Sequence, residues 1–330
     1  MRRKNIVTIG GGTGSFMLLS GLKKYPVNLA AIVSMTDDGG STGVLRDELG
    51  VLPPGDVRQC LVALSDSSKE LRELMNYRFA EGGLKGHSFG NLFLSALEKI
   101  NHSFSKGVEK AARILDVRGE VIPVTETDIV LCMDLQNGVK LAGEEEINHN
   151  RDLQRAGIKK FYLRPRAKAS SKAIKQLLAA DLIVIGPGNH YCSIAPNFLV
   201  DGIPQAIRKS KAKVVYNCNL VNKSSHTDGY FLEDYVTALN GLIGAERIDF
   251  VTFNSRRPDA KLIKKYAKTK DLLVKVRDLR GDHNYQIIMA NLLSNSKPKF
   301  SAADAIAAQR SFIRHDGAKL AKTLMSILQS

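Results

Sequence analysis

The 330-residue chain has no tryptophan, only four cysteines and no apolar run near the roughly 18 residues that a membrane-spanning helix needs. The cysteines lie far apart and form no CxxC pair, which argues against a zinc knuckle and against a disulfide framework. The basic N-terminus is followed by an apolar stretch of only Ile6–Ile9, whereas a signal peptide needs about 7–15 apolar residues and a cleavage site. We therefore expect a cytoplasmic protein without a membrane span.

Positive charge is in excess, since 48 Lys and Arg against 33 Asp and Glu give a net charge of +15. This excess favours anionic partners but does not distinguish nucleic acid, membrane surface and phosphate ligands. It is concentrated in residues 151–180 and 256–280, which form either an anion-attracting face or solvated helix surface. No aromatic pattern for base stacking and no Cys/His finger spacing accompanies it, so the motifs do not support nucleic-acid binding.

Short apolar runs alternate with helix-length amphipathic stretches, which is typical of βαβ units. Strands are predicted at Asn5–Ile9 and Leu29–Ser34 with one helix (15–24) between them, so this pair should be parallel with a right-handed crossover. Further strands are predicted at 181–185, 213–217, 249–253 and 273–277, and a C-terminal helix at 302–328. With no linker or repeat, residues 1–330 are expected to form a single α/β domain with a Rossmann-like, mostly parallel layered sheet.

Two segments depart from this alternation. Residues 56–115 predict an inserted helical subdomain, in which Ser88 caps a helix that begins after GHS. Residues 127–142 place Asn137-Gly138 between two alternating runs, which is a strong signal for an antiparallel hairpin. We expect this hairpin to form one edge of the fold.

The first candidate site is the turn IGGGTGS after the first strand. Glycines there let the backbone approach a ligand, and the free N–H groups at a helix start attract phosphate. The sixth position of a dinucleotide fingerprint is Ser15 here, and the second strand ends in Ser34-Met35 without an acidic residue, so the motif does not favour NAD. The alternative is a tight turn needed only for packing. The candidate ligand-binding residues are Gly11, Gly12, Thr13 and Gly14.

The second candidate site is TDDGGSTG (36–43), at the carboxyl end of the second strand, where open α/β sheets bind ligands. Asp37 or Asp38 could hold Mg²⁺ or a ribose hydroxyl. The small residues that follow suit a diphosphate, and the candidates among them are Gly40, Ser41 and Thr42. The alternative is a capping loop in which Asp and Ser satisfy local amides.

Three further motifs add candidate residues. In LPPGDVRQCL, Asp56 can cap a helix, and Arg58 in its first turn indicates either a salt bridge with Asp56 or a bound anion. In GHSFGNL, His87 and Asn91 share one helical face or cap, where His87 is either an acid/base or ligand contact or a structural histidine. DLIVIGPGNHYCS is again a strand that enters a Gly-Pro-Gly turn, and its candidates for a second ligand-facing loop are Gly186, Gly188 and Asn189.

In this order, GGGTG, TDDGGSTG, PPGDVR, GHSFGNL and the GPG segment resemble the family that joins the bacterial gluconeogenesis factors (YvcK-type) with 2-phospho-L-lactate transferase (CofD-type). The resemblance runs from residue 5 to about 320. TDDGGSTG and PPGDVR resemble the gluconeogenesis-factor branch. That branch implies a regulator without a required cofactor, which binds a nucleotide sugar of the UDP-N-acetylglucosamine type. It also implies a role in cell shape and wall synthesis during gluconeogenic growth, with a protein partner in cell-wall regulation.

The resemblance also covers the second half of the chain. In NLVNKSSHTDG, Asn219 and Thr227 match the family pattern, whereas Lys223, Ser225 and His226 replace its Gln, Gly and Glu. Asn189 and Asn219 are thereby expected to contact the sugar or the base. Tyr266 and Arg314 match C-terminal elements of the family. Tyr266 is a candidate to stack on a base and Arg314 to pair with a phosphate, the alternatives being a core tyrosine and a helix-capping arginine.

The sequence leaves three functions open. The first is the nucleotide-sugar-binding regulator, which needs no nucleophile and base. The second is an Mg²⁺-dependent transferase that moves a phospholactyl group from a guanine-nucleotide donor to a deazaflavin, with the metal at Asp37 and Asp38; phosphoryl-type chemistry needs mainly positioning and Mg²⁺. The third, a nucleic-acid or membrane-surface binder, rests on net charge alone. A homodimer is expected only because such dimers are the commonest oligomers.

Overall fold

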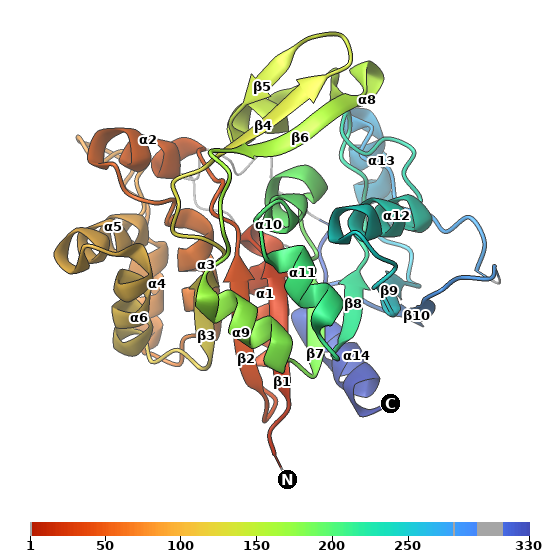
Figure 1. The fold of residues 1–330 in the computed structure, drawn as a ribbon, viewed down its shortest axis with the longest axis horizontal. Helices are drawn as coiled ribbons and strands as arrows, with labels where there is room; N and C mark the ends of the chain where they lie inside the picture. The colour runs from red at the N-terminus through yellow and green to blue at the C-terminus, as the bar shows by residue number, and fades with distance from the viewer. Residues whose placement is uncertain (1, 280, 296–312) are drawn as a thin grey trace.

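The computed structural model describes residues 2–279, 281–295 and 313–330 and places a seven-stranded parallel sheet at the centre of the molecule (Figure 1). The strand order is β10-β9-β8-β7-β1-β2-β3. The strands are β1 (Asn5–Gly10), β2 (Asn28–Val33), β3 (Glu120–Pro123), β7 (Leu182–Ile185), β8 (Lys213–Asn217), β9 (Phe250–Asn254) and β10 (Gln286–Ala290). Five of the six predicted strands are thus confirmed, and β1 and β2 pair in parallel as expected.

The direction of strand order reverses at β1. The chain moves from β1 to β2 and β3 on one side, and from β7 to β8, β9 and β10 on the other. Because crossovers between parallel strands are right-handed, the helices of the two halves lie on opposite faces of the sheet. One face carries α1 (Gly12–Leu22), α3 (Gly55–Leu64) and α14 (Gly317–Gln329), and the other carries α9 (Ser171–Ala179), α11 (Ile203–Lys209) and α12 (Leu232–Ile243). The switch point between β1 and β7 is where such sheets bind ligands.

Strands that are buried on both faces explain the continuous apolar runs of the sequence. Residues 6–9 of β1 and all of β7 are almost completely buried between the two helical layers. The central strands therefore form the core, and their carboxyl ends are fixed in position. This fixed edge supports the turns that follow β1 and β7.

Most of the helical segment between β2 and β3 was predicted. It contains α2 (Gly40–Leu49), α3, α4 (Lys69–Asn76), α5 (Phe89–Asn101) and α6 (Phe104–Ile114). The Ser88 hydroxyl accepts the Asn91 N–H at 3.2 Å, which confirms the predicted cap of α5. Helix α2 was not predicted, because its first turn consists of the small residues that were interpreted as a ligand loop.

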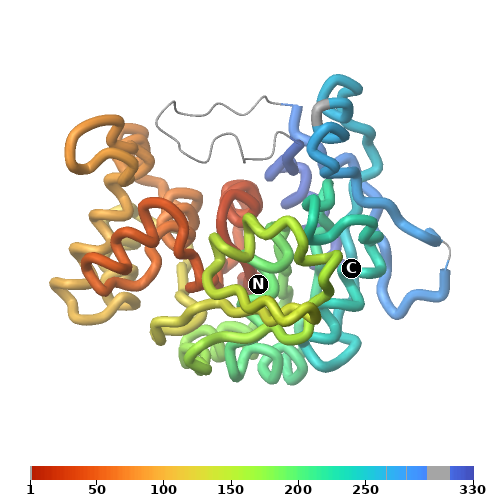
Figure 2. The backbone as a smooth tube through the Cα atoms, turned by 90° about the horizontal axis from the view of Figure 1, so that it is seen from above, coloured from red at the N-terminus to blue at the C-terminus, as the bar shows by residue number. Residues whose placement is uncertain are grey.

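The predicted hairpin is present, with Gly138 at φ +89° between β4 (Val130–Leu135) and β5 (Lys140–Ala142). The hairpin does not join the main sheet. It pairs instead with β6 (Ile158–Arg164) in a separate antiparallel sheet. This small sheet and the short helices α7 (Glu144–His149) and α8 (Leu153–Ala156) lie over the carboxyl ends of the central strands (Figures 1 and 2).

Other sequence-based expectations need correction. Residues 273–277 form only isolated bridges, because β10 occupies the place beside β9. The basic stretch 151–180 is partly strand, since it contains β6. The C-terminal helix is α14, and residues 302–312 of the predicted helix lie outside the described residues. The remaining helices are η1 (His190–Ile194), α10 (Ala195–Phe198) and α13 (Ala260–Thr269).

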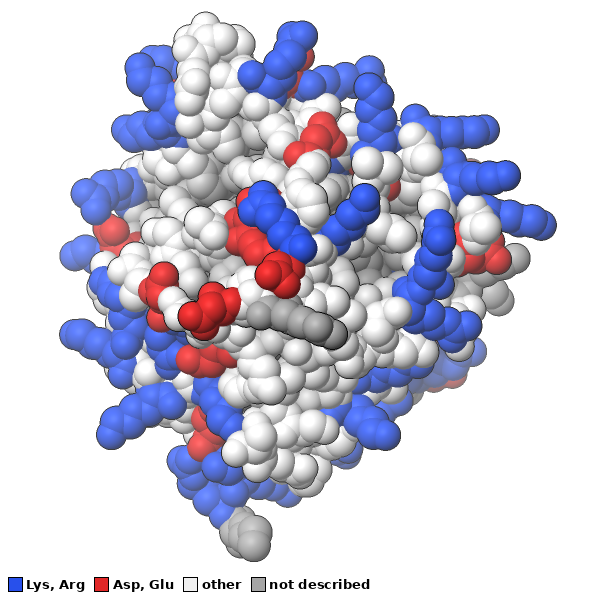
Figure 3. Space-filling view, turned by 90° about the vertical axis from the view of Figure 1, so that its right-hand side faces the viewer, with Lys and Arg blue, Asp and Glu red and all other residues white. Residues whose placement is uncertain are grey.

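The surface agrees with the strongly basic composition. On the side of α12, α13 and β10, many Lys and Arg side chains lie around the rim of the face, and fewer acidic side chains lie among them (Figure 3). Within the described part of the chain, none of the helices combines the length and the apolar character needed to cross a bilayer.

The crossing of α1 and α14 gives a test of this packing. A Cβ added at Gly21 would lie 1.9 Å from the Gly317 carbonyl oxygen, so the two helix backbones are in direct contact. We expect Gly21→Ala to lower the free energy of unfolding by about 1–3 kcal/mol, because the added methyl group overpacks the contact. Urea denaturation measures the change.

The matched control is Gly241→Ala in α12. Nothing lies within 4 Å of a Cβ at this exposed position. Alanine there should raise stability by about 0.5–1 kcal/mol, because glycine is the poorer helix former. Equal effects of the two substitutions would contradict the described packing of α1 against α14.

Candidate functional site

The turns after β1 (10–14) and β7 (186–189), here called the switch-point loops, are in direct backbone contact. A Cβ added at Gly14 would lie only 1.9 Å from the Pro187 carbonyl oxygen. Asn219 fixes the second loop, since its Nδ2 donates to the Gly188 carbonyl at 2.9 Å and its Oδ1 accepts the Gly188 N–H at 3.4 Å. Asn217 Nδ2 likewise donates to the Gly186 carbonyl at 2.9 Å. The two predicted loops therefore meet at one place, with a close backbone fit that only glycine permits at position 14.

Asp56 does not cap α3 as predicted, because α3 begins one residue earlier and its N-cap, Pro54, has no side-chain acceptor. The Asp56 carboxylate instead lies against the β1 turn. Its Oδ2 occupies the space that a Cβ of Gly11 would need, at 2.0 Å, and the carboxylate accepts the Gly12 N–H. Asp56 thus connects the start of α3 to the first switch-point loop.

Asp37 and Asp38 also connect separate segments. Asp37 Oδ1 accepts the Gly39 N–H at 3.1 Å, and its other oxygen lies 2.6 Å from the position of a Cβ on Gly55 at the start of α3. Asp38 accepts the N–H groups of Glu144 and Glu145, at 3.1 and 2.8 Å, at the beginning of α7. Asp38 therefore acts as a helix cap, which was the alternative considered for this loop. The helix that it caps, α7, is remote in sequence.

The side chains of Asp37, Asp38, Asp56 and Glu144, here called the carboxylate cluster, are close enough to affect one another's ionisation. Burial and, to a smaller extent, the charge of Asp37 raise the pKa of Asp56 to about 7, although the Gly12 N–H and the Arg58 charge act to lower it. Burial is also the main cause that raises the pKa of Asp37, and it raises the pKa of Glu144 well above its ordinary value. Negative charge is therefore unfavourable here without a balancing cation.

Four predicted residues form one hydrogen-bonded group behind this cluster. Asn91 donates to Ser41 Oγ at 3.3 Å and accepts from Arg58 Nε at 3.0 Å. The His87 Nδ1 atom lies 3.1 Å from Ser41 Oγ. Arg58, which is 7% exposed, also donates to Asn76 Oδ1 at 2.7 Å and so joins α3 to α4 and α5. The group supports α2, whose Thr42 hydroxyl donates to Asp37.

The loop at 219–229 reaches the second switch-point loop through Asn148 of α7. Asn148 Oδ1 accepts from Asn189 Nδ2 at 3.0 Å, and its carbonyl oxygen accepts from Lys223 Nζ at 3.0 Å. Thr227 is buried inside the loop, where its hydroxyl accepts the Lys223 N–H and the Tyr235 O–H, each at 2.9 Å. Lys223 thus brings an ammonium group toward Glu144. Burial lowers the pKa of Lys223, and the negative charge of Glu144 acts in the opposite direction.

Tyr266 and Arg314 belong to the C-terminal part of the fold. The Tyr266 hydroxyl accepts the Ile313 N–H at 3.1 Å, and the Arg314 carbonyl accepts the Ser294 N–H at 2.9 Å. These contacts connect α13 with the segments that lead from β10 and into α14. Contact of either side chain with a ligand stays a prediction.

Comparison with known proteins identifies the family of this chain. Residues 6–293 match the family described as 2-phospho-L-lactate transferase CofD. The chain belongs to the CofD family. A gluconeogenesis factor from Halalkalibacterium halodurans is 41% identical over 82% of this chain and 83% of its own length. A protein from Thermoanaerobacterium thermosulfurigenes, provisionally named a gluconeogenesis factor, is 39% identical over 98% of this chain and 97% of its own.

A solved structure supports both the family and the fold. The crystal structure of a UPF0052 family member from Bacillus halodurans has a TM-score of 0.87 and 36% sequence identity, and the match covers 98% of this chain and 99% of that one. The α/β fold with a mostly parallel sheet is therefore shared with this relative, and the resemblance read from the motifs is confirmed at the level of the family.

Within this CofD-family fold, sequence reasoning missed Glu144 and Asn148. Glu144 accepts the Thr36 hydroxyl at 3.3 Å, and Asn148 joins the two loops described above. Both lie in GEEEINHN after the hairpin, which contains no recognisable ligand motif. Only the packing of the small sheet over the central strands brings them to the site. A run of three glutamates in a basic chain was the one available signal.

The carboxylates fit Mg²⁺ only in part. Among residues 2–279, 281–295 and 313–330, no three His, Cys, Asp or Glu side chains are arranged to hold a metal ion. Both oxygens of Asp38 accept amide hydrogens, so Asp37 and Asp56 are the better oxygen donors. Mg²⁺ commonly binds one or two carboxylates together with phosphate oxygens of a substrate. These residues would therefore hold Mg²⁺ in company with a phosphorylated ligand.

The raised pKa of Asp56 predicts a pH-dependent difference between wild type and Asp56→Asn. A carboxyl whose pKa is raised to about 7 by folding stabilises the protein below its unfolded pKa, and that stability is lost as pH rises through 7. The Asp56→Asn variant would not lose this stability as pH rises, because its side-chain amide does not ionise. The amide oxygen can still accept the Gly12 N–H. The stability of the variant relative to wild type should therefore rise between pH 4 and 7.

Urea titrations at several pH values measure this difference. Comparison with wild type is needed because burial lowers the pKa of His190, His226 and His315 to about 4, which gives wild-type stability an opposite slope over the same range. These histidine contributions are common to both proteins. A difference that stays constant with pH would contradict the described environment of Asp56.

Proposed function

We propose that this CofD-family protein is a regulator of the gluconeogenesis-factor type that binds a nucleotide sugar such as UDP-N-acetylglucosamine between the switch-point loops. The observation that carries the proposal is the backbone contact of Gly14 with Pro187 at the point where strand order reverses. Two glycine-rich turns and the start of α1 thereby meet where open α/β sheets bind nucleotides. The names of the relatives support the gluconeogenic role.

The contacts suggest a division of roles among the predicted residues. Thr13 and Gly14 at the start of α1 would receive the diphosphate, since Gly12 already donates its N–H to Asp56. Asn189 would contact the sugar or base, next to Asn148 and Lys223. Asn219 would act through Gly188, because both atoms of its amide hold that residue.

The negative charge of the carboxylate cluster opposes the binding of an anionic ligand. A diphosphate beside the carboxylate cluster is repelled unless a cation lies between them, because burial and the neighbouring Asp37 charge already disfavour the ionised form of Asp56. Mg²⁺ bound by Asp37, Asp56 and the diphosphate would supply that charge. We therefore include Mg²⁺ in the proposal as an aid to ligand binding. Control of cell shape and wall synthesis under gluconeogenic growth would follow through a protein partner that distinguishes the bound from the free form.

Calorimetric titration with UDP-N-acetylglucosamine tests the binding site. We expect saturable binding, and Asn189→Ala should weaken it about tenfold or more, because a buried polar contact contributes on the order of 1–3 kcal/mol. Asn137→Ala in the hairpin turn is the matched control and should bind as wild type does. Absence of heat at millimolar ligand, or equal loss in both variants, would rule the site out.

A second titration tests the role of the metal. With Mg²⁺ present, affinity for the nucleotide sugar should exceed that measured in EDTA, since the cation offsets the repulsion between diphosphate and carboxylates. In Asp37→Asn the gain from Mg²⁺ should shrink, while binding in EDTA should be equal or stronger because one negative charge is gone. An unchanged affinity upon EDTA treatment of wild type would contradict this role.

The carboxylate cluster also favours a second function, the 2-phospho-L-lactate transfer that the family description names, for which the cluster would hold Mg²⁺. Turnover of a guanine-nucleotide-linked phospholactate with a deazaflavin acceptor would establish the transferase. Binding of UDP-N-acetylglucosamine without such turnover would favour the regulator.

A further inference from the structure

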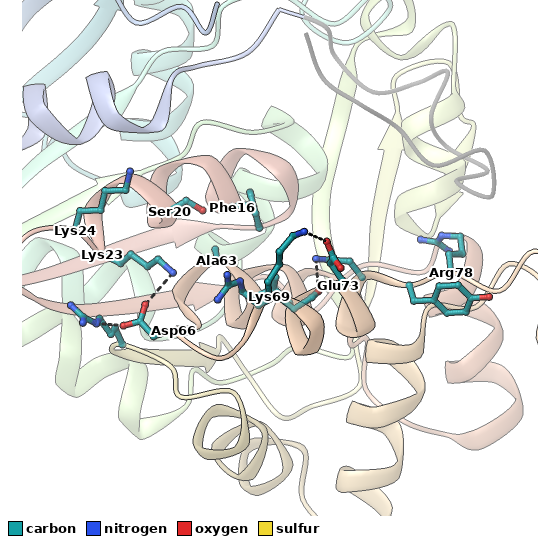
Figure 4. Close-up of a pocket in the computed structure, with 14 residues that line it drawn as sticks. Phe16, Ser20, Lys23, Lys24, Ala63, Asp66, Lys69, Glu73 and Arg78 are labelled. Carbon is teal, nitrogen blue, oxygen red and sulfur yellow. Dashed lines mark hydrogen bonds and ion pairs between the residues drawn. The ribbon is translucent and has the colours of Figure 1, made fainter. Parts of the chain in front are cut away.

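A second surface feature lies apart from the switch-point loops. A cleft of about 910 Å³, here called the α1–α4 cleft, lies between the later turns of α1, the end of α3, and α4 (Figure 4). None of the predicted ligand-binding residues lines it. Its described lining residues are Phe16, Ser20, Lys23, Lys24, Val62, Ala63, Asp66, Lys69, Arg72, Glu73, Asn76, Tyr77, Arg78 and Arg118.

The lining is strongly basic. Of the described lining residues, six are Lys or Arg and two are acidic. Asp66 is shared by two cations, Lys23 at 3.4 Å and Arg118, and Glu73 pairs with Lys69 at 3.4 Å. Two carboxylates therefore face six cations, and an excess of positive charge remains along the cleft.

The arginines of the cleft are held in place by backbone acceptors. Arg72 donates to the Ser67 carbonyl, and Arg78 donates to the Gly86 carbonyl. Neutral carbonyl groups do not neutralise the guanidinium charge, and each guanidinium has further N–H donors. Such positions suit carboxylates of a partner, because guanidinium and carboxylate groups match in shape and charge.

The shape and the lining of the cleft indicate a polypeptide. Figure 4 shows the cations in a row, from Lys24 beside α1 through Lys69 to Arg78. The lining also has an apolar part, which contains the buried Val62 and Ala63, the half-buried Phe16, and Tyr77, whose exposure is 51%. An elongated groove with a row of cations and an apolar part fits an acidic segment that also carries apolar side chains.

We propose that the α1–α4 cleft is a docking surface for an acidic, partly apolar segment of a partner protein. The row of cations would pair with its carboxylates, and the apolar part of the lining would receive its apolar side chains. The proposal does not depend on nucleotide-sugar binding, since the cleft and the switch-point loops share no lining residue. Both regions nevertheless use α1 and α3, whose first turns contact the loops and whose last turns line the cleft.

Fluorescence anisotropy of the full chain with a labelled peptide tests the surface. The probe is a short peptide of glutamates interrupted by leucine and phenylalanine. We expect the double variant Lys24→Glu/Lys69→Glu to bind it at least tenfold more weakly than wild type. The matched control, Lys209→Glu/Lys211→Glu at the exposed end of α11, changes net charge equally and should retain most of the affinity.

A third variant tests the apolar part of the lining. Tyr77→Ala should weaken binding of this peptide severalfold but leave binding of an all-glutamate peptide nearly unchanged. Circular dichroism melts should show that all variants fold, which is expected because the substituted side chains are exposed.

Two outcomes would overturn the proposal. Equal losses in the cleft variant and the control would mean that the peptide responds only to net charge. Stronger binding of an oligothymidylate of matched charge, lost in the cleft variant and indifferent to Tyr77→Ala, would assign the cleft to nucleic acid. Loss of peptide binding confined to the cleft variants supports the docking surface, whatever the result of the UDP-N-acetylglucosamine titration.

Discussion

The contact between the two switch-point loops is the constraint on which the site depends. Gly14 of the first loop lies against the Pro187 carbonyl of the second, and no side chain fits between them. This closeness follows from parallel pairing of β1 and β7, since it places their carboxyl ends side by side. It also requires glycine at the first turn of α1, where helix propensity alone would disfavour it. The low helix propensity of Gly14 is therefore an unfavourable local contribution that allows the two backbones to come together at the switch point.

Carboxylates then join the remaining segments to this centre. Asp56 holds the β1 turn, Asp37 lies against the start of α3, and Asp38 caps α7 beneath the small sheet. Each acid satisfies backbone N–H groups or fills the space beside a glycine, so the cluster has a structural role whatever ligand is bound. Its concentration of negative charge is nevertheless unfavourable, as the raised pKa of Asp56 indicates. For this reason the proposed function includes Mg²⁺ together with the anionic ligand.

The sequence predicted what depends on local pattern. Apolar runs such as Leu182–Ile185 identify buried parallel strands because burial on both faces leaves no polar alternation. The family motifs contain both glycine turns and each of Ser41, Arg58, His87 and Asn91, but nothing in the motifs predicts that these four side chains form one hydrogen-bonded group. The sequence pattern did not predict features that depend on tertiary packing. Residues 273–277 have strand-like composition but only bridge neighbouring segments, and nothing local marks Glu144 or the partnership of Asp38 with α7.

Hydrogen–deuterium exchange with saturating UDP-N-acetylglucosamine and Mg²⁺ is the decisive test of a single site formed by the two switch-point loops, because it reports on the backbone amides of both loops at once. The account predicts that segments 11–14 and 186–189 become protected together, while the α1–α4 cleft exchanges as before. Protection of one loop without the other, or of neither while the ligand is bound elsewhere, would contradict a single site formed by the two turns.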